Sequence, residues 1–188
     1  MPIFRSQHQA ALLAWLLLHP SNEYTLTDLA RRLGVPLSTV QREADRLVAG
    51  GLLRDRTIGR ARLLQANPDN RATAPLTQLL ELSFGPQPVI AEEFTVPGVE
   101  RVLIFGSWAQ RYCGTPGAPP HDVDVLVLGH PERADVYDAA DRAQDRLGMQ
   151  VNPVIRTSQQ WDEATDPLIV QVKTAALVDA TPSQVGDG

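Results

Sequence analysis

Two apolar segments, each joined to a short polar motif, constrain the fold of this chain most strongly. The first, residues 102–105, leads into a Gly-Ser turn, and the second, residues 123–128, follows the pair Asp122 and Asp124. Side chains two positions apart on a strand point to the same face of the sheet, so we expect these two carboxylates to lie side by side. Such a pair repels unless one member is protonated or a cation lies between them.

The chemistry of these two motifs favours a cation bound together with phosphates. Oxygen ligands on a rigid strand suit Mg²⁺, which takes one or two carboxylates and completes its shell with water and phosphate oxygens. The turn at Gly106 and Ser107 precedes a predicted helix, whose first backbone N–H groups can bind phosphate. The sequence therefore predicts a site for a nucleoside triphosphate with Mg²⁺.

The same segment resembles the minimal nucleotidyltransferase domain of the DNA polymerase β superfamily, over about residues 88–180. It carries the motif G-S-x-x-x-R-x-x-G from residue 106 to residue 114, followed by D-x-D. The resemblance implies that Gly106, Ser107 and Arg111 bind the nucleotide. It further implies that Asp122 and Asp124 are the catalytic residues that hold the metal.

In that family, a third acid on a neighbouring strand helps to activate the hydroxyl that attacks the nucleotide. The chain departs from the family at this position. The strand expected to carry the acid, residues 149–155, has Gln150 and Asn152 on its polar face. An amide can offer a carbonyl oxygen to a metal, but it cannot act as a general base. The exchange favours nucleotide binding over transfer, and it leaves open whether the protein is an enzyme.

The N-terminal half follows a helix-turn-helix pattern. Residues 6–18 form an apolar helical segment, and Thr25 begins a second helix with a capping pattern. A third helix begins at Ser38 and ends before Gly50. Residues 52–64 then predict two short strands around a glycine turn.

This order resembles the winged helix-turn-helix domains of bacterial regulators of the arsenic-repressor type, over about residues 4–66. The resemblance places the third helix in the major groove of double-stranded DNA and the hairpin, or wing, on the backbone. Gln and Arg on such a helix can form bidentate bonds to base edges. The residues expected to contact DNA are Ser38, Thr39, Gln41, Arg42 and Arg46 on the helix, and Arg54, Arg56, Arg60 and Arg62 on the wing.

Charge is distributed unequally between the two halves. Residues 1–85 contain ten arginines against seven acids, a net charge of +3, whereas residues 86–188 have a net charge of −8. A basic half suits nucleic acid, and repulsion from DNA phosphates makes broad DNA contact by the acidic half unfavourable.

We therefore predict an α+β protein, an N-terminal winged helix-turn-helix followed by a nucleotidyltransferase-like α/β domain with a small mixed sheet. The expected parts are residues 1–68 for DNA binding, 69–86 as a linker helix, 87–180 as the nucleotidyltransferase-like domain and 181–188 as a flexible tail. The apolar segment of residues 10–18 is too short to span a bilayer and lacks a cleavage pattern, so we expect a cytoplasmic protein without membrane contact.

The first helix is apolar almost all round and must be buried on both sides. One side can pack against the core of its own domain. The other side predicts a homodimer surface, formed with or without the linker helix, or a contact with the second domain. The sequence leaves these alternatives open.

Two functions compete at this point. One is a dimeric DNA-binding transcriptional regulator whose second domain binds a nucleotide with Mg²⁺. The other is an active nucleotidyltransferase that adenylylates its target, similar to antitoxins of the minimal nucleotidyltransferase type, with an autoregulatory DNA-binding domain. A pseudoenzyme that only mediates contacts is a third, weaker possibility.

Overall fold

The computed structural model describes residues 4–118 and 120–182 and divides into two compact units, Met1–Phe84 and Gly85–Gly188. We call these unit 1 and unit 2 and describe each by itself. Within the described residues, every helix is too short or too polar to cross a lipid bilayer.

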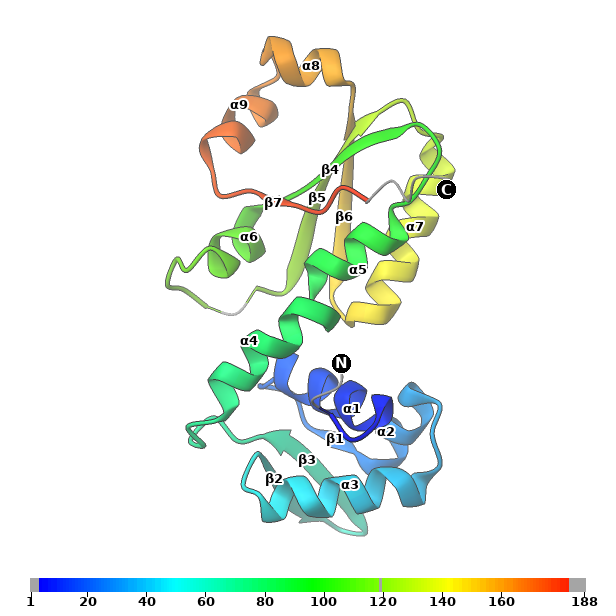
Figure 1. Ribbon diagram of the computed structural model, residues 1–188, viewed down its shortest axis with the longest axis vertical. Helices are drawn as coiled ribbons and strands as arrows, with labels where there is room; N and C mark the ends of the chain where they lie inside the picture. Colours follow the sequence, from blue (N-terminus) through cyan, green and yellow to red (C-terminus); the bar gives the residue numbers. More distant parts are fainter. Residues whose placement is uncertain (1–3, 119, 183–188) are drawn as a thin grey trace. The chain divides into compact units, whose positions relative to one another are not determined.

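Unit 1 combines four helices with a small antiparallel sheet (Figure 1). Its strands lie in the order β1-β3-β2. The elements in chain order are α1 (Gln7–Leu18), β1 (Tyr24–Thr25), α2 (Leu26–Leu33), α3 (Leu37–Ala49), β2 (Leu53–Ile58), β3 (Ala61–Ala66) and α4 (Thr73–Phe84).

The cap that the sequence predicts at Thr25 is present, and the third helix begins at Leu37, one residue before the predicted Ser38. The Thr25 hydroxyl accepts a hydrogen bond from the backbone N–H of Asp28 at the start of α2, which satisfies one of the free donors of that helix. Helix α2 ends at Gly34 in the left-handed conformation, and α3 begins directly after Pro36. This short connection fixes α2 and α3 as a helix-turn-helix.

Helix α1 is covered on both sides within unit 1. It packs against α2 and β3 and, on another side, against α4. Its residues join one apolar cluster with residues of α2, α3, β2, β3 and α4. The burial of the apolar helix is thus explained inside the unit. The apolar surface on which the homodimer prediction depended is covered, and the dimer stays a prediction.

The predicted wing is a regular hairpin. Strands β2 and β3 pair from Leu53 opposite Ala66 to Ile58 opposite Ala61, which leaves a two-residue turn. The first turn residue, Gly59, has a positive φ of 60°, as two-residue hairpin turns require.

Unit 2 is a four-stranded mixed sheet with helices on both faces (Figure 1). The strand order is β6-β5-β4-β7, and only the pair β5 and β6 is parallel. The elements are α5 (Pro86–Glu93), β4 (Val99–Phe105), α6 (Gly106–Tyr112), β5 (Asp122–Gly129), α7 (Arg133–Leu147), β6 (Gln150–Arg156), α8 (Ser158–Glu163), α9 (Pro167–Thr174) and β7 (Val178–Asp179).

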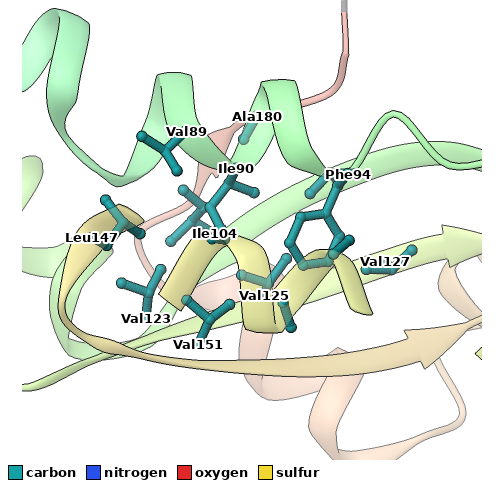
Figure 2. Close-up of a cluster of buried hydrophobic side chains, with 14 of the residues drawn as sticks. Val89, Ile90, Phe94, Ile104, Val123, Val125, Val127, Leu147, Val151 and Ala180 are labelled. Atoms are coloured by element: carbon teal, nitrogen blue, oxygen red, sulfur yellow. The ribbon is translucent and has the colours of Figure 1, made fainter. Parts of the chain in front are cut away.

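Alternating apolar side chains give the sheet two buried faces. On one face, Val123, Val125 and Val127 of β5 pack with residues of α5 and α7, and Figure 2 shows Ile90 and Phe94 of α5 over these valines. On the other face, leucines of β4 and β5 pack with residues of α8 and α9. The inner strands are therefore buried on both sides, while the polar ends of β5 and β6 remain available for a site.

Near the C-terminus the sheet extends further than the sequence predicts. The short strand β7 pairs with β4, and the Thr181 hydroxyl accepts a hydrogen bond from the backbone N–H of Val102. The start of the predicted flexible tail is thus held against the sheet. Residues 183–188 of that tail lie outside the described residues.

Candidate functional site

The two aspartates lie side by side at the start of β5, as the sequence predicts. Both side chains are half-buried, while Val123 between them is fully buried on the opposite face. Burial, as the main cause, and the negative charge of Asp122 raise the pKa of Asp124, and a hydrogen bond from Asn152 opposes the rise. The pair is therefore an electrostatically unfavourable arrangement that a cation would relieve.

Gly106 is in direct contact with this pair. Strand β4 ends opposite Asp124, and Gly106 follows it with a positive φ of 75°. A Cβ atom at this position would lie 2.3 Å from Oδ2 of Asp124. Only glycine allows both the conformation and this close approach. The turn and the acid pair thus form one site, although they are distant in sequence.

Strand β6 places two amide side chains beside the acid pair. In the parallel register, Gln150 lies opposite Asp122 and Asn152 lies opposite Asp124. The Nδ2 group of Asn152 donates to Oδ2 of Asp122 at 3.1 Å and to Oδ1 of Asp124 at 3.2 Å. Within residues 4–118 and 120–182, no three His, Cys, Asp or Glu side chains are grouped so that they could hold a metal.

A pocket of about 530 Å³ opens beside Asp122. It brings together two of the predicted nucleotide-binding residues, Ser107 and Arg111, but Asp124 and Asn152 do not line it. The described residues that line it are Ser107, Gln110, Arg111, Thr115, Pro116, Gly117, Ala118, Pro120, His121, Asp122 and Gln150. Sequence reasoning missed Gln110, Thr115 and His121 as lining residues. His121 could have been expected there because it directly precedes Asp122 in the sequence. No sequence signal indicates that Thr115 lines the pocket.

The donor set of this site fits one divalent cation with phosphates. Two half-buried carboxylates supply anionic oxygens, and the Arg111 guanidinium on the pocket wall provides positive charge for an anionic ligand. The side chain of Arg111 is held by a hydrogen bond from Nη1 to the backbone oxygen of Thr115 at 3.0 Å.

In unit 1, the predicted recognition face of α3 is exposed. Ser38, Gln41, Arg42 and Arg46 are exposed, and Thr39 is half-buried. No other described side chain forms a hydrogen bond or ion pair with the head group of Arg42. Arg46, in contrast, donates from Nη1 to Oε1 of Glu43 at 2.9 Å.

Glu43 was not anticipated as a structural residue of α3. It is the one charged side chain among the buried described residues, and it accepts a hydrogen bond from Nε2 of Gln9 on α1 at 3.2 Å. This contact fixes the buried side of the recognition helix to α1. A weak signal is present in the sequence, since Glu43 lies three positions after Val40 and directly before Ala44, on the buried side of the helix.

The wing arginines are mostly paired with acids. Arg54 pairs with Asp69, and Arg56 donates from Nε to Glu23 at 2.6 Å, which lowers the pKa of Glu23. Among the described residues, no acid contacts Arg60, the second residue of the turn. The remaining wing arginine, Arg62, bridges two acids.

Arg62 connects the wing with the recognition helix. It pairs with Asp45 on α3, and its Nε donates to Asp55 on β2 at 2.7 Å. These contacts, first the one with Asp45, raise the pKa of Arg62 above its ordinary value. Arg62 thus has a structural role within the unit that the prediction of DNA contact did not include.

Residues 5–62 of the chain match the MarR family. This segment of unit 1 is therefore similar to the winged helix DNA-binding domains of the MarR family. The winged helix-turn-helix that the sequence predicts is confirmed, and the family that matches it is MarR. The match ends at residue 62 and does not include any residue of unit 2.

Parts of the chain are also similar to solved structures. BpsR of Bordetella bronchiseptica, whose DNA binding is regulated by 6-hydroxynicotinic acid, is 24% identical over 45% of this chain, with a TM-score of 0.33. The aligned part spans 64% of the BpsR chain. TrmBL2, an archaeal chromatin protein, is 16% identical over 90% of this chain and 69% of its own, with a TM-score of 0.28. No curated protein matches the chain significantly.

Proposed function

We propose that this protein is a DNA-binding transcriptional regulator whose unit 2 binds a nucleoside triphosphate together with Mg²⁺. The observation that carries the DNA-binding part is the match of residues 5–62 to the MarR family. The exposed, basic face of α3 supports it, since Gln41 and Arg42 there can reach base edges.

The nucleotide part of the proposal is supported by the geometry around Asp122. The acid pair, the close approach of Gly106 and the pocket with Ser107 and Arg111 combine the chemistry that a metal-bound triphosphate needs. When bound, Mg²⁺ would neutralise the carboxylates and hold phosphate oxygens. Asp122 and Asp124 would hold the ion, while Ser107 and Arg111 would orient the phosphates.

Transfer of a nucleotidyl group is the less favoured alternative. A transferase needs a group that accepts the proton of the attacking hydroxyl, and the position opposite Asp124 is occupied by the Asn152 amide. The amide already donates to both carboxylates. We therefore expect binding without turnover, or turnover far slower than in relatives that have three acids.

The regulator proposal is tested by selection from genomic fragments. The intact protein should enrich a small set of fragments, and a fragment footprint should show protection of a defined sequence. A near-palindromic site with half-sites about one helical turn apart would support a dimer. Equal binding of all fragments would contradict the regulator function.

The nucleotide proposal is tested by thermal unfolding. With Mg²⁺ present, nucleoside triphosphates should raise the melting temperature, and the shift should grow with the logarithm of ligand concentration. Absence of any shift at millimolar nucleotide would contradict the proposed ligand. Inorganic phosphate with Mg²⁺ serves as the control for a nonspecific anion effect.

A further inference from the structure

Asn152 is the only described side chain that forms hydrogen bonds with either member of the acid pair. Its Nδ2 group lies 3.1 Å from Oδ2 of Asp122 and 3.2 Å from Oδ1 of Asp124. Because only the nitrogen side of an amide can donate, the Asn152 side chain faces the two carboxylates with its N–H groups and turns its carbonyl away. The amide therefore compensates the repulsion between the two acids while no cation is bound.

This arrangement cannot persist when a cation lies between the acids. N–H hydrogens would then point at a positive charge, whereas the amide oxygen is a ligand that hard divalent cations accept. Rotation of the terminal amide by half a turn exchanges Nδ2 and Oδ1 in nearly the same place. Such a rotation needs no movement of β6, because the terminal torsion of Asn has two broad minima.

The charge of the site sets a limit on how many cations it holds. Asp122 and Asp124 supply two negative charges, and Asn152 adds an oxygen but no charge. No third acid of the described residues joins them. One divalent cation neutralises the pair, whereas a second one within a few ångströms would repel the first and would have triphosphate oxygens but no further protein carboxylate as anionic ligands.

On the basis of the proposed nucleotide function, we propose that the acid pair holds a single divalent cation and that Asn152 supplies its carbonyl oxygen to it. The amide of Asn152 thus exchanges between two roles. It donates to both carboxylates in the absence of metal, and it is a neutral ligand in its presence. Asn152 thereby sets the stoichiometry of the site at one metal for each bound nucleotide.

Equilibrium dialysis with Mn²⁺ and a non-hydrolysable nucleoside triphosphate tests this proposal. The intact protein is kept in excess over nucleotide, so that retention of the nucleotide measures the proposed function and the ratio of Mn²⁺ to retained nucleotide measures the stoichiometry. We expect a ratio of one for the wild type and an electron paramagnetic resonance spectrum of isolated Mn²⁺. A ratio of two, with a spectrum broadened by a neighbouring Mn²⁺, would overturn the proposal while leaving the nucleotide function intact. Failure to retain nucleotide would instead contradict the proposed function.

Two variants separate the roles of Asn152. Asn152→Asp adds the missing charge and should raise the ratio to two, whereas a ratio that stays at one would show that Asn152 does not set it. Asn152→Leu keeps the size but removes the amide, and it should weaken Mn²⁺ binding about tenfold or more. Unchanged or tighter Mn²⁺ binding by Asn152→Leu would overturn the ligand role. Asn22→Asp in unit 1 introduces the same charge on an exposed residue and should leave both quantities unchanged.

Discussion

In unit 1 most arginines of the wing are paired with acids, whereas in unit 2 a neutral amide bridges two like charges that lie side by side. The first arrangement distributes charge over several pairs, such as Arg56 with Glu23 and Arg62 with Asp45. The second concentrates an unfavourable interaction at Asp122 and Asp124, with one side chain, Asn152, to relieve it. Single substitutions should therefore have graded effects on DNA binding by the wing arginines and all-or-none effects on cation binding by the two aspartates.

The largest effect is expected from Asp122→Asn, which removes half of the anionic ligands of the cation. For the wild type, nucleotide and Mg²⁺ at a hundred times the dissociation constant should add about 2.7 kcal/mol to the free energy of unfolding. The variant should lose this stabilisation entirely in a thermal-shift assay. Asp162→Asn, which changes an exposed acid on α8, is the matched control. A full shift with Asp122→Asn would show that the nucleotide binds elsewhere.

Arg42→Ala should have the largest effect in unit 1, because its head group is exposed and can reach a base edge. We expect a loss of about 1–3 kcal/mol on the preferred DNA site and a smaller loss on unrelated sequences. Fluorescence anisotropy with both DNAs measures the two losses. Arg133→Ala, an exposed arginine of unit 2, is the control. Equal losses on both DNAs would refute base contact by Arg42.

Wing arginines that form ion pairs within unit 1 should contribute less to DNA binding than a wing arginine without such a pair. Arg60→Ala should weaken binding to all sequences and reduce the slope of affinity against salt concentration by about one. Arg56→Ala should have a smaller effect, since Glu23 holds that side chain. Glu23→Gln, which frees Arg56, should instead make the slope steeper. A change in slope for Arg56→Ala as large as that for Arg60→Ala would contradict this difference.

The smallest effect concerns the stability of unit 2 in acid. Glu93 on α5 pairs with Arg146 and Arg142 of α7 at 2.6 and 2.8 Å, and these contacts, first the one with Arg146, lower the pKa of Glu93. A lowered pKa stabilises the fold above the ordinary glutamate pKa of about 4.3, and this stabilisation is lost as the pH falls through the folded value.

Glu93→Gln should therefore lower the free energy of unfolding by about 0.5–1 kcal/mol at neutral pH and flatten its decrease below about pH 4. Thermal unfolding between pH 7 and pH 3 measures both. Glu92→Gln is the comparison, since the Glu92 side chain is 67% exposed and, among the described residues, forms its ion pair with Arg146, so its effect should be smaller. An unchanged pH dependence in Glu93→Gln would rule out this network as a source of acid sensitivity.

Local patterns predicted most of the fold. The cap at Thr25 and the hairpin turn at Gly59 lie where the sequence predicts them, because short-range chemistry determines helix ends and hairpin turns. The alternation of residues 122–128 correctly gave a strand with both aspartates on one face. Which side chains of a strand share a face can be predicted from the strand's own sequence, without knowledge of the neighbouring strands.

Contacts between distant segments could not be predicted in the same way. The sequence did not show that α4 covers α1, and it therefore suggested a dimer surface there. It also did not show that Glu23 pairs with Arg56, which lies 33 residues further along the chain. In unit 2, the sequence shows an amide at Asn152, but the hydrogen bonds of this side chain to both aspartates depend on the parallel register of β5 and β6.

Incubation of the intact protein with labelled ATP and Mg²⁺, with and without its preferred DNA, tests the central proposal most directly. One assay follows retention of ATP by the protein, and a second follows release of pyrophosphate and transfer of label to protein, DNA or small molecules. We predict saturable, Mg²⁺-dependent retention of about one ATP per chain without appreciable transfer. Rapid transfer would establish an enzyme in which another group replaces the third acid, and no retention at all would contradict nucleotide binding by unit 2.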